Sequence, residues 1–99
     1  MVDEPDYTHW QQILELIETS SRSGQHELLL TLLLTVDERD ALLARVNIFT
    51  ELLKGDLSQR QISQLLGVGV ATITRGSNTL KDASEQQKKQ LFNMLSKTS

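Results

Sequence analysis

Residues Ser58–Lys81 read SQRQISQLLGVGVATITRGSNTLK, and this stretch decides the fold. Ser58 and Gln61 have the spacing of a capping box, in which each side chain accepts a backbone N–H group at the start of a helix. Gly67 ends that first helix and supplies a residue that tolerates positive φ, as a tight turn requires. A second short helix is predicted after the turn. Two short helices joined by a glycine turn predict a helix-turn-helix at about Gln59–Lys81.

The second helix of such a motif lies in the major groove of DNA, so its outer face is the candidate contact surface. Short side chains on this face would let the backbone approach the bases: Ala71, Thr72, Thr74 and Ser77. Basic side chains lie around it for phosphate or guanine contacts: Arg60, Arg75 and Lys81. We add three neighbouring residues to the DNA-contact set: Gln59, Gly69 and Val70. The side chains expected to pack the two helices together are Ile62, Leu65, Leu66, Val70 and Ile73.

A helical hairpin in an ordinary bundle is the alternative interpretation of this pattern, with the threonines merely exposed to solvent. Thr72, Thr74 and Gly76 all lower the helix propensity of the second helix, and the glycine alone costs about 1 kcal/mol relative to alanine. A helix that keeps such residues needs close approach by another group. This favours the DNA-binding interpretation.

The whole chain is predicted to be all-α, as a single domain over residues 1–99 without internal repeats. Apolar periodicity, capping boxes and glycine stops indicate six helices and no strand. Their expected ranges are 6–20, 25–34, 35–54, 58–66 and 70–81, with a terminal helix starting at a Ser84–Gln87 box. The side chains expected to face inward outside the motif are Tyr7, Trp10, Ile13, Leu14, Ile17, Leu42, Leu43, Val46, Phe49, Leu52, Leu53, Leu91, Met94 and Leu95.

The segment Leu28–Leu34 has six leucines in seven positions, interrupted only by Thr31. A helix that is apolar on nearly all sides must be buried, and a chain of 99 residues has little core of its own. We therefore expect this segment to lie against a second copy of the chain, in a homodimer. It is far shorter than the roughly 20 residues of a membrane-spanning helix.

The charge of the chain is unevenly distributed. The net charge is −3, yet residues 54–81 carry four basic side chains against one acidic side chain, a net charge of +3. Residues 1–18 alone contribute −5. An acidic body with one basic segment is compatible with DNA binding but predicts little non-specific affinity.

The residue types exclude most catalytic chemistry. The chain has no cysteine, which excludes disulfides, thiolate metal sites and cysteine nucleophiles. His9 and His26 lack further ligands at metal spacing, so both are predicted to be surface residues and no metal site is expected. We find no phosphate-binding loop and no nucleophile with its base, and expect no enzyme activity. The N-terminus has no signal-like apolar stretch, so a cytoplasmic location is expected.

Beyond these patterns, residues 32–81 resemble the Trp repressor family in LLLTVDERDALLARVNIFTELLKGDLSQRQ and in GVGVATITRGSNTLK. The segment Ala71–Asn78 is highly characteristic of that family, and the resemblance continues more weakly towards both ends. It implies an intertwined homodimer of helical chains that binds palindromic operator DNA. It further implies repression of tryptophan biosynthesis genes when the corepressor L-tryptophan is bound.

The resemblance also implies a ligand-binding set for L-tryptophan: Leu32, Leu34, Thr35, Arg45, Arg75, Gly76 and Thr79. Arg45 and Arg75 would enclose the indole ring, and Arg75 would pair with the carboxylate. This agrees with the way guanidinium groups stack on rings and bind carboxylates. Thr35 would help to hold the carboxylate, while carbonyl groups near the two leucines of the other subunit would accept from the ammonium group. Without the resemblance, a salt bridge on its own helix is the simpler role for Arg45.

Three positions depart from the residues usual in that family. Val36 replaces a proline, Asn47 a basic residue and Thr79 a serine. The implied mechanism is a population shift, in which the ligand favours a spacing of the two recognition helices that matches successive major grooves. Two alternatives stay open: a repressor of the same fold that answers another ligand or none, and a helical dimerisation module that does not bind DNA.

Overall fold

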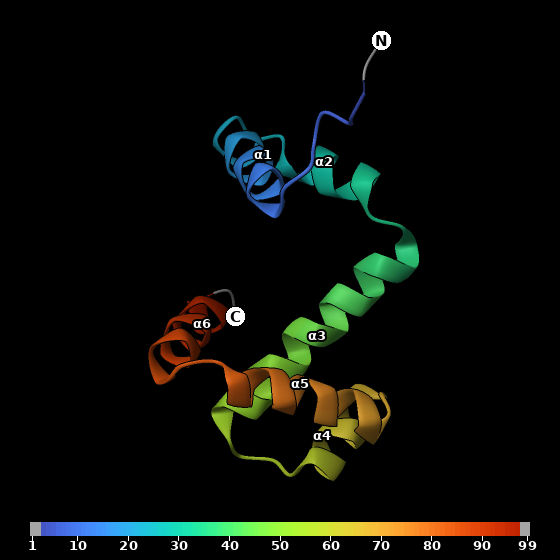
Figure 1. The fold of residues 1–99 in the computed structure, drawn as a ribbon. Coiled ribbons are helices and arrows are strands. Elements are labelled where there is room, and N and C mark those ends of the chain that lie inside the picture. Colours follow the sequence, from blue (N-terminus) through green and yellow to red (C-terminus); the bar gives the residue numbers. More distant parts are fainter. Residues whose placement is uncertain (1–2, 98–99) are drawn as a thin grey trace. The chain divides into compact units, whose positions relative to one another are not determined.

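A computed structural model describes residues 3–97 of the chain, and these residues form six α-helices and no strand. The all-α class with six helices is therefore confirmed for this part of the chain. Figure 1 labels the helices in chain order: α1 Trp10–Arg22, α2 His26–Leu33, α3 Val36–Lys54, α4 Gln59–Leu66, α5 Val70–Asp82 and α6 Glu85–Lys97.

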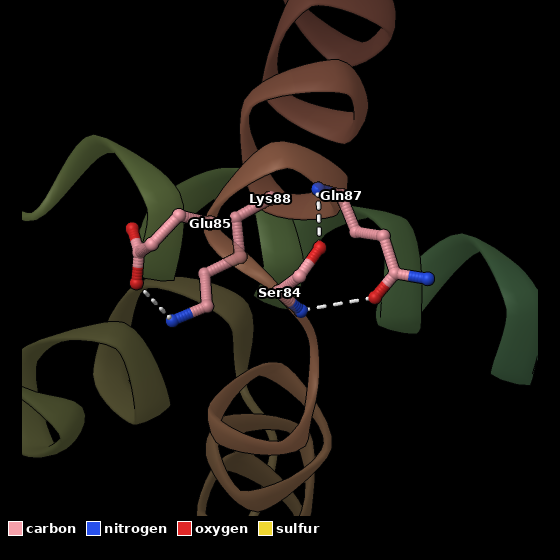
Figure 2. A network of polar contacts seen from close by, with 4 residues as sticks. All are labelled: Ser84, Glu85, Gln87 and Lys88. Carbon is pink, nitrogen blue, oxygen red and sulfur yellow. Dashed lines mark hydrogen bonds and ion pairs between the residues drawn. The ribbon is translucent and has the colours of Figure 1, made fainter.

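Two of the helices begin at the capping boxes that the sequence predicts. At α4, the Gln61 backbone N–H donates to Ser58 Oγ at 3.1 Å, and the Ser58 N–H donates to Gln61 Oε1 at 2.8 Å. At α6, Gln87 donates to Ser84 Oγ at 3.0 Å, and Ser84 donates to Gln87 Oε1 at 2.9 Å (Figure 2). Each box satisfies two N–H groups that a helix start leaves without partners.

Two helices of the second unit stop at glycines in the left-handed region. Gly55, after α3, has φ of 73°, and Gly67, after α4, has φ of 68°. A side chain is strained in this conformation, whereas glycine adopts it freely. The predicted stop at Gly67 is confirmed, and so is the expected end of the long helix at residue 54.

The start of α1 lies four residues later than the sequence pattern predicts. Gln12 Oε1 accepts the backbone N–H groups of Thr8 at 2.7 Å and His9 at 2.9 Å, and the helix begins at Trp10. The expected start at residue 6 was wrong. Tyr7 continues the apolar spacing of the helix towards the N-terminus, but it precedes His9, which caps the helix.

The chain divides into two compact units, the first ending at Asp37 and the second beginning at Glu38. In the first unit α1 packs against α2, yet neither helix has a fully buried residue. Trp10 is 70% exposed. This tryptophan is therefore not a core residue of the single chain, and the expectation that it faces inward is wrong for the chain alone.

The core of the second unit consists of one isoleucine from each of three helices: Ile48 on α3, Ile62 on α4 and Ile73 on α5. All three side chains are at most 2% exposed. Partly buried side chains pack around them: Phe49, Leu52, Leu57, Leu66 and Val68. This core holds α5 against both α4 and the second half of α3.

Several side chains expected inside are exposed in the single chain: Leu14, Leu42, Leu43, Val46, Leu65, Val70 and Met94. In α4, Ile62 is fully buried and Leu66 packs against the isoleucine core, whereas Leu65 is 61% exposed. The exposed residues of α3 precede the part of that helix that packs on the motif. Apolar spacing identifies apolar stripes, but it does not tell which stripe the chain itself covers.

Candidate nucleic-acid interface and ligand pocket

The turn between α4 and α5 is closed by three hydrogen bonds that all involve Ser63. The backbone N–H groups of Gly67 and Val68 donate to the Ser63 carbonyl oxygen at 2.9 and 3.3 Å. The Ser63 hydroxyl in turn donates to the Val68 carbonyl oxygen at 2.5 Å. The two helices of the predicted helix-turn-helix therefore meet through a turn that is held by hydrogen bonds within the chain.

A side-chain hydrogen bond also joins the two helices of the motif. Thr74 Oγ1 on α5 lies 3.0 Å from Gln59 Oε1 at the start of α4 and 3.0 Å from the Val70 carbonyl oxygen. The hydroxyl has one proton and donates to one of these acceptors at a time. The Gln59 carboxamide N–H groups stay available to an outside acceptor, since only its oxygen takes part in this contact.

The outer face of α5 carries the side chains that the sequence assigns to DNA contact. Those exposed on or just before α5 are Gly69, Val70, Ala71, Thr72, Thr74, Arg75 and Lys81. Arg60 on α4 is also exposed, while Gln59 and Ser77 are half-buried. Gly69 is the N-cap of α5, so the positive end of this helix is adjacent to the exposed surface. The surface combines short side chains with basic ones.

A small pocket of about 150 Å³ lies between α3 and α5. It is lined by four residues of α3 and two of α5: Ala41, Ala44, Arg45, Ile48, Thr72 and Gly76. The structure thus brings together Arg45 and Gly76, two of the residues expected at the ligand. Thr72, expected at DNA, lines the same pocket and is also exposed. The pocket and the candidate DNA surface share α5.

Gly76 on α5 lies directly against two side chains of α3. A Cβ atom at this position would lie 3.0 Å from Ile48 Cγ2 and 3.3 Å from Phe49 Cε1. The helix propensity that this glycine forgoes is therefore explained within the chain, by the packing of α3. The close approach that this glycine indicates is therefore made by α3, an element of the same unit.

The remaining expected ligand residues lie elsewhere. Arg75 is exposed and is not among the residues that line this pocket. The Thr79 hydroxyl donates to the Arg75 carbonyl oxygen at 3.1 Å, and Thr79 lines a separate groove beside α6. Leu32, Leu34 and Thr35 belong to the first unit.

Sequence reasoning missed three lining residues of the pocket. Ala41, Ala44 and Ile48 share one face of α3 with Arg45, at spacings of three, four and seven residues. The sequence contained a signal for this pocket, since two alanines, Ala41 and Ala44, share a helix face with Arg45. Small side chains at these positions leave room that leucine would fill.

The described residues contain no group of three or more histidine, cysteine, aspartate or glutamate side chains placed to hold a metal ion. Within the same part of the chain, no helix is long and apolar enough to cross a membrane. Two short helices at a tight, internally bonded turn, with a basic outer face on the second helix, define a helix-turn-helix DNA-binding protein.

Comparison with known proteins defines the family. Residues 8–95 match the model of the Trp repressor protein family. A Trp operon repressor homolog of Vibrio parahaemolyticus is 67% identical over 91 residues, which cover 92% of this chain and 88% of the relative. A homolog of the same name from Vibrio atlanticus is 60% identical over 97 residues, covering 98% and 99%. The chain belongs to the Trp repressor family, and it is a tryptophan-dependent transcriptional repressor rather than an enzyme.

Proposed function

We propose that this chain acts as a homodimer that binds the operator DNA of tryptophan biosynthesis genes when L-tryptophan occupies the pocket between α3 and α5. The observation that carries this proposal is that Arg45, Gly76 and Thr72 line one pocket, because Thr72 also lies on the exposed face of α5. A ligand there would touch the element that enters the major groove. Because the operator DNA of a bacterium lies in the cytoplasm, the proposed function includes a cytoplasmic location.

In the proposed ligand site, the guanidinium groups of Arg45 and Arg75 enclose the indole ring, and Arg75 pairs with the carboxylate. Guanidinium planes stack on aromatic faces and bind carboxylates in a fork-like geometry, so the same residue type serves both ends of the ligand. Thr35 adds a hydroxyl for the carboxylate. Carbonyl groups near Leu32 and Leu34 of the partner subunit accept from the ammonium group.

In the proposed DNA interface, α5 enters the major groove with its N-terminal residues towards the bases. Val70, Ala71 and Thr74 are exposed there and are short enough for close approach. Arg60 and Lys81 lie at the two ends of the motif and neutralise phosphates. The Gln59 amide, whose oxygen meets Thr74, donates to a phosphate through its remaining N–H groups.

The switch is a change in the population of α5 orientations. Helix-turn-helix dimers, those of this family among them, bind half-sites about 34 Å apart. A ligand between α3 and α5 favours DNA binding only to the extent that it binds the DNA-competent spacing more tightly than other spacings.

The proposed dimer is supported by the apolar surface that the single chain leaves open. On α2, Leu28, Leu32 and Leu33 are 59%, 76% and 56% exposed. Large exposed apolar surfaces on a chain of this size mark interaction sites. Sedimentation equilibrium tests this point, with a mass of twice 11.2 kDa expected.

Calorimetric titration of the protein with L-tryptophan, and with L-phenylalanine as the control, tests the ligand site. We expect saturable binding of one tryptophan per chain and little heat from phenylalanine. Absence of tryptophan binding, or equal affinity for both amino acids, would contradict the proposed ligand site.

A further inference from the structure

The side chains of Arg45 and Phe49 lie one helical turn apart on α3 and are in contact. The Arg45 Cζ atom is 5.6 Å from the centroid of the Phe49 ring. This is within the roughly 6 Å at which a guanidinium group is attracted to the face of an aromatic ring. The i, i+4 spacing places the two side chains on the same face of the helix.

The Phe49 ring is itself held in place by its neighbours. It is half-buried and packs against the isoleucine core of the second unit. Its edge atom Cε1 lies 3.3 Å from the position that a Cβ atom on Gly76 would take, so the ring lies close against α5. A ring fixed by the core gives the Arg45 guanidinium a firm contact surface.

The same arginine lines the pocket between α3 and α5, while Phe49 does not. Arg45 thus contacts the ring and borders the pocket at once. An exposed arginine otherwise samples many rotamers, and that freedom is lost when a ligand fixes the side chain. A partner that restricts the rotamers beforehand lowers this entropy loss and so strengthens ligand binding.

We propose that Phe49 is a positioning residue for the ligand site. It holds the Arg45 guanidinium beside the pocket through a cation–π contact, before the ligand arrives. The inference rests on the proposed function, in which Arg45 stacks on the indole ring of L-tryptophan. Phe49 itself does not touch the ligand in this arrangement.

The expected size of the effect follows from the strength of such contacts. A cation–π contact at an exposed site corresponds to a roughly two- to five-fold change in a dissociation constant. Phe49→Leu keeps an apolar side chain of similar bulk but removes the ring face. We expect it to weaken L-tryptophan binding by this factor, whereas Phe49→Tyr, which keeps a ring, retains the affinity of the unmodified protein.

A double-mutant cycle measured by calorimetric titration with L-tryptophan separates positioning from packing. The cycle uses the unmodified protein, Phe49→Leu, Arg45→Met and the double variant. If Phe49 acts through Arg45, its substitution changes the affinity only when the arginine is present. An equal change in the Arg45→Met background would overturn the proposal, because a packing defect persists without the arginine.

A second measurement applies if Arg45→Met binds too weakly to titrate. Nitrogen-15 relaxation of the Arg45 Nε–H group in the ligand-free dimer should show a lower order parameter in Phe49→Leu than in the unmodified protein. Unchanged order would overturn the proposal even where tryptophan still binds. If the unmodified protein binds no tryptophan, the proposed function fails, and the positioning role fails with it.

Discussion

At the scale of single residues, Gly76 both packs within the second unit and lines the proposed ligand pocket. A methyl group here would press on Ile48 and Phe49, at 3.0 and 3.3 Å. Overpacking of a core costs about 1–3 kcal/mol, and the gain in helix propensity offsets about 1 kcal/mol of this.

We therefore predict that Gly76→Ala lowers the free energy of unfolding by no more than about 2 kcal/mol but weakens tryptophan binding about tenfold, since the added group also narrows the pocket. Urea unfolding and calorimetry measure the two effects. Gly69→Ala is the matched control, because no atom lies within 4 Å of a Cβ at that position. Equal losses of tryptophan affinity in both variants would contradict this account of Gly76.

Arg75 has no role in the core of the unit, since it is exposed on α5. Arg75→Ala is therefore expected to leave thermal stability nearly unchanged while it abolishes tryptophan-dependent DNA binding. Arg22→Ala is the control, because Arg22 is also exposed and pairs with Glu18 on its own helix. An Arg75→Ala protein that still responds to tryptophan would show that the carboxylate is held elsewhere.

At the scale of helices, two capping boxes of the same chemistry serve different parts of the second unit. Ser58→Ala and Ser84→Ala each remove a side-chain acceptor, and loss of a cap costs about 0.5–2 kcal/mol. We expect similar losses in the free energy of unfolding. Only Ser58→Ala should also weaken DNA binding, because α4 carries the motif whereas α6 does not. Equal loss of operator affinity in both variants would argue against a separate role for α4.

The sequence predicts the helices and the motif well because their signals are local. Capping at Ser58 and Ser84 and the stop at Gly67 depend on residues within one turn. The exposure of Leu42 and Leu65 could not be predicted this way, since it depends on which distant elements cover each face of a helix. At the site, Arg45 and Gly76, two residues that the family resemblance assigns to the ligand, line one pocket. The contact between Arg45 and the Phe49 ring could not be predicted, because it depends on how the ring packs against the core.

At the scale of the whole molecule, the basic segment lies in a chain with a net charge of −3. The basic side chains of this segment are proposed to contact phosphates, and such contacts release counterions from the DNA. The logarithm of the DNA association constant should therefore fall linearly with the logarithm of the salt concentration. Lys81→Gln removes one contact per subunit and should make the slope shallower by roughly two units for a dimer. Lys89→Gln, on α6, is the control. A slope that Lys81→Gln leaves unchanged would remove this residue from the interface.

The central claim is tested most directly by measuring operator affinity with and without L-tryptophan, by fluorescence anisotropy at fixed salt. The duplex should come from upstream of the tryptophan biosynthesis genes of the same genome. We expect at least tenfold tighter operator binding with tryptophan and, by linkage, an equal gain in tryptophan affinity when the operator is bound. Equal affinity in both conditions would contradict a tryptophan-dependent switch.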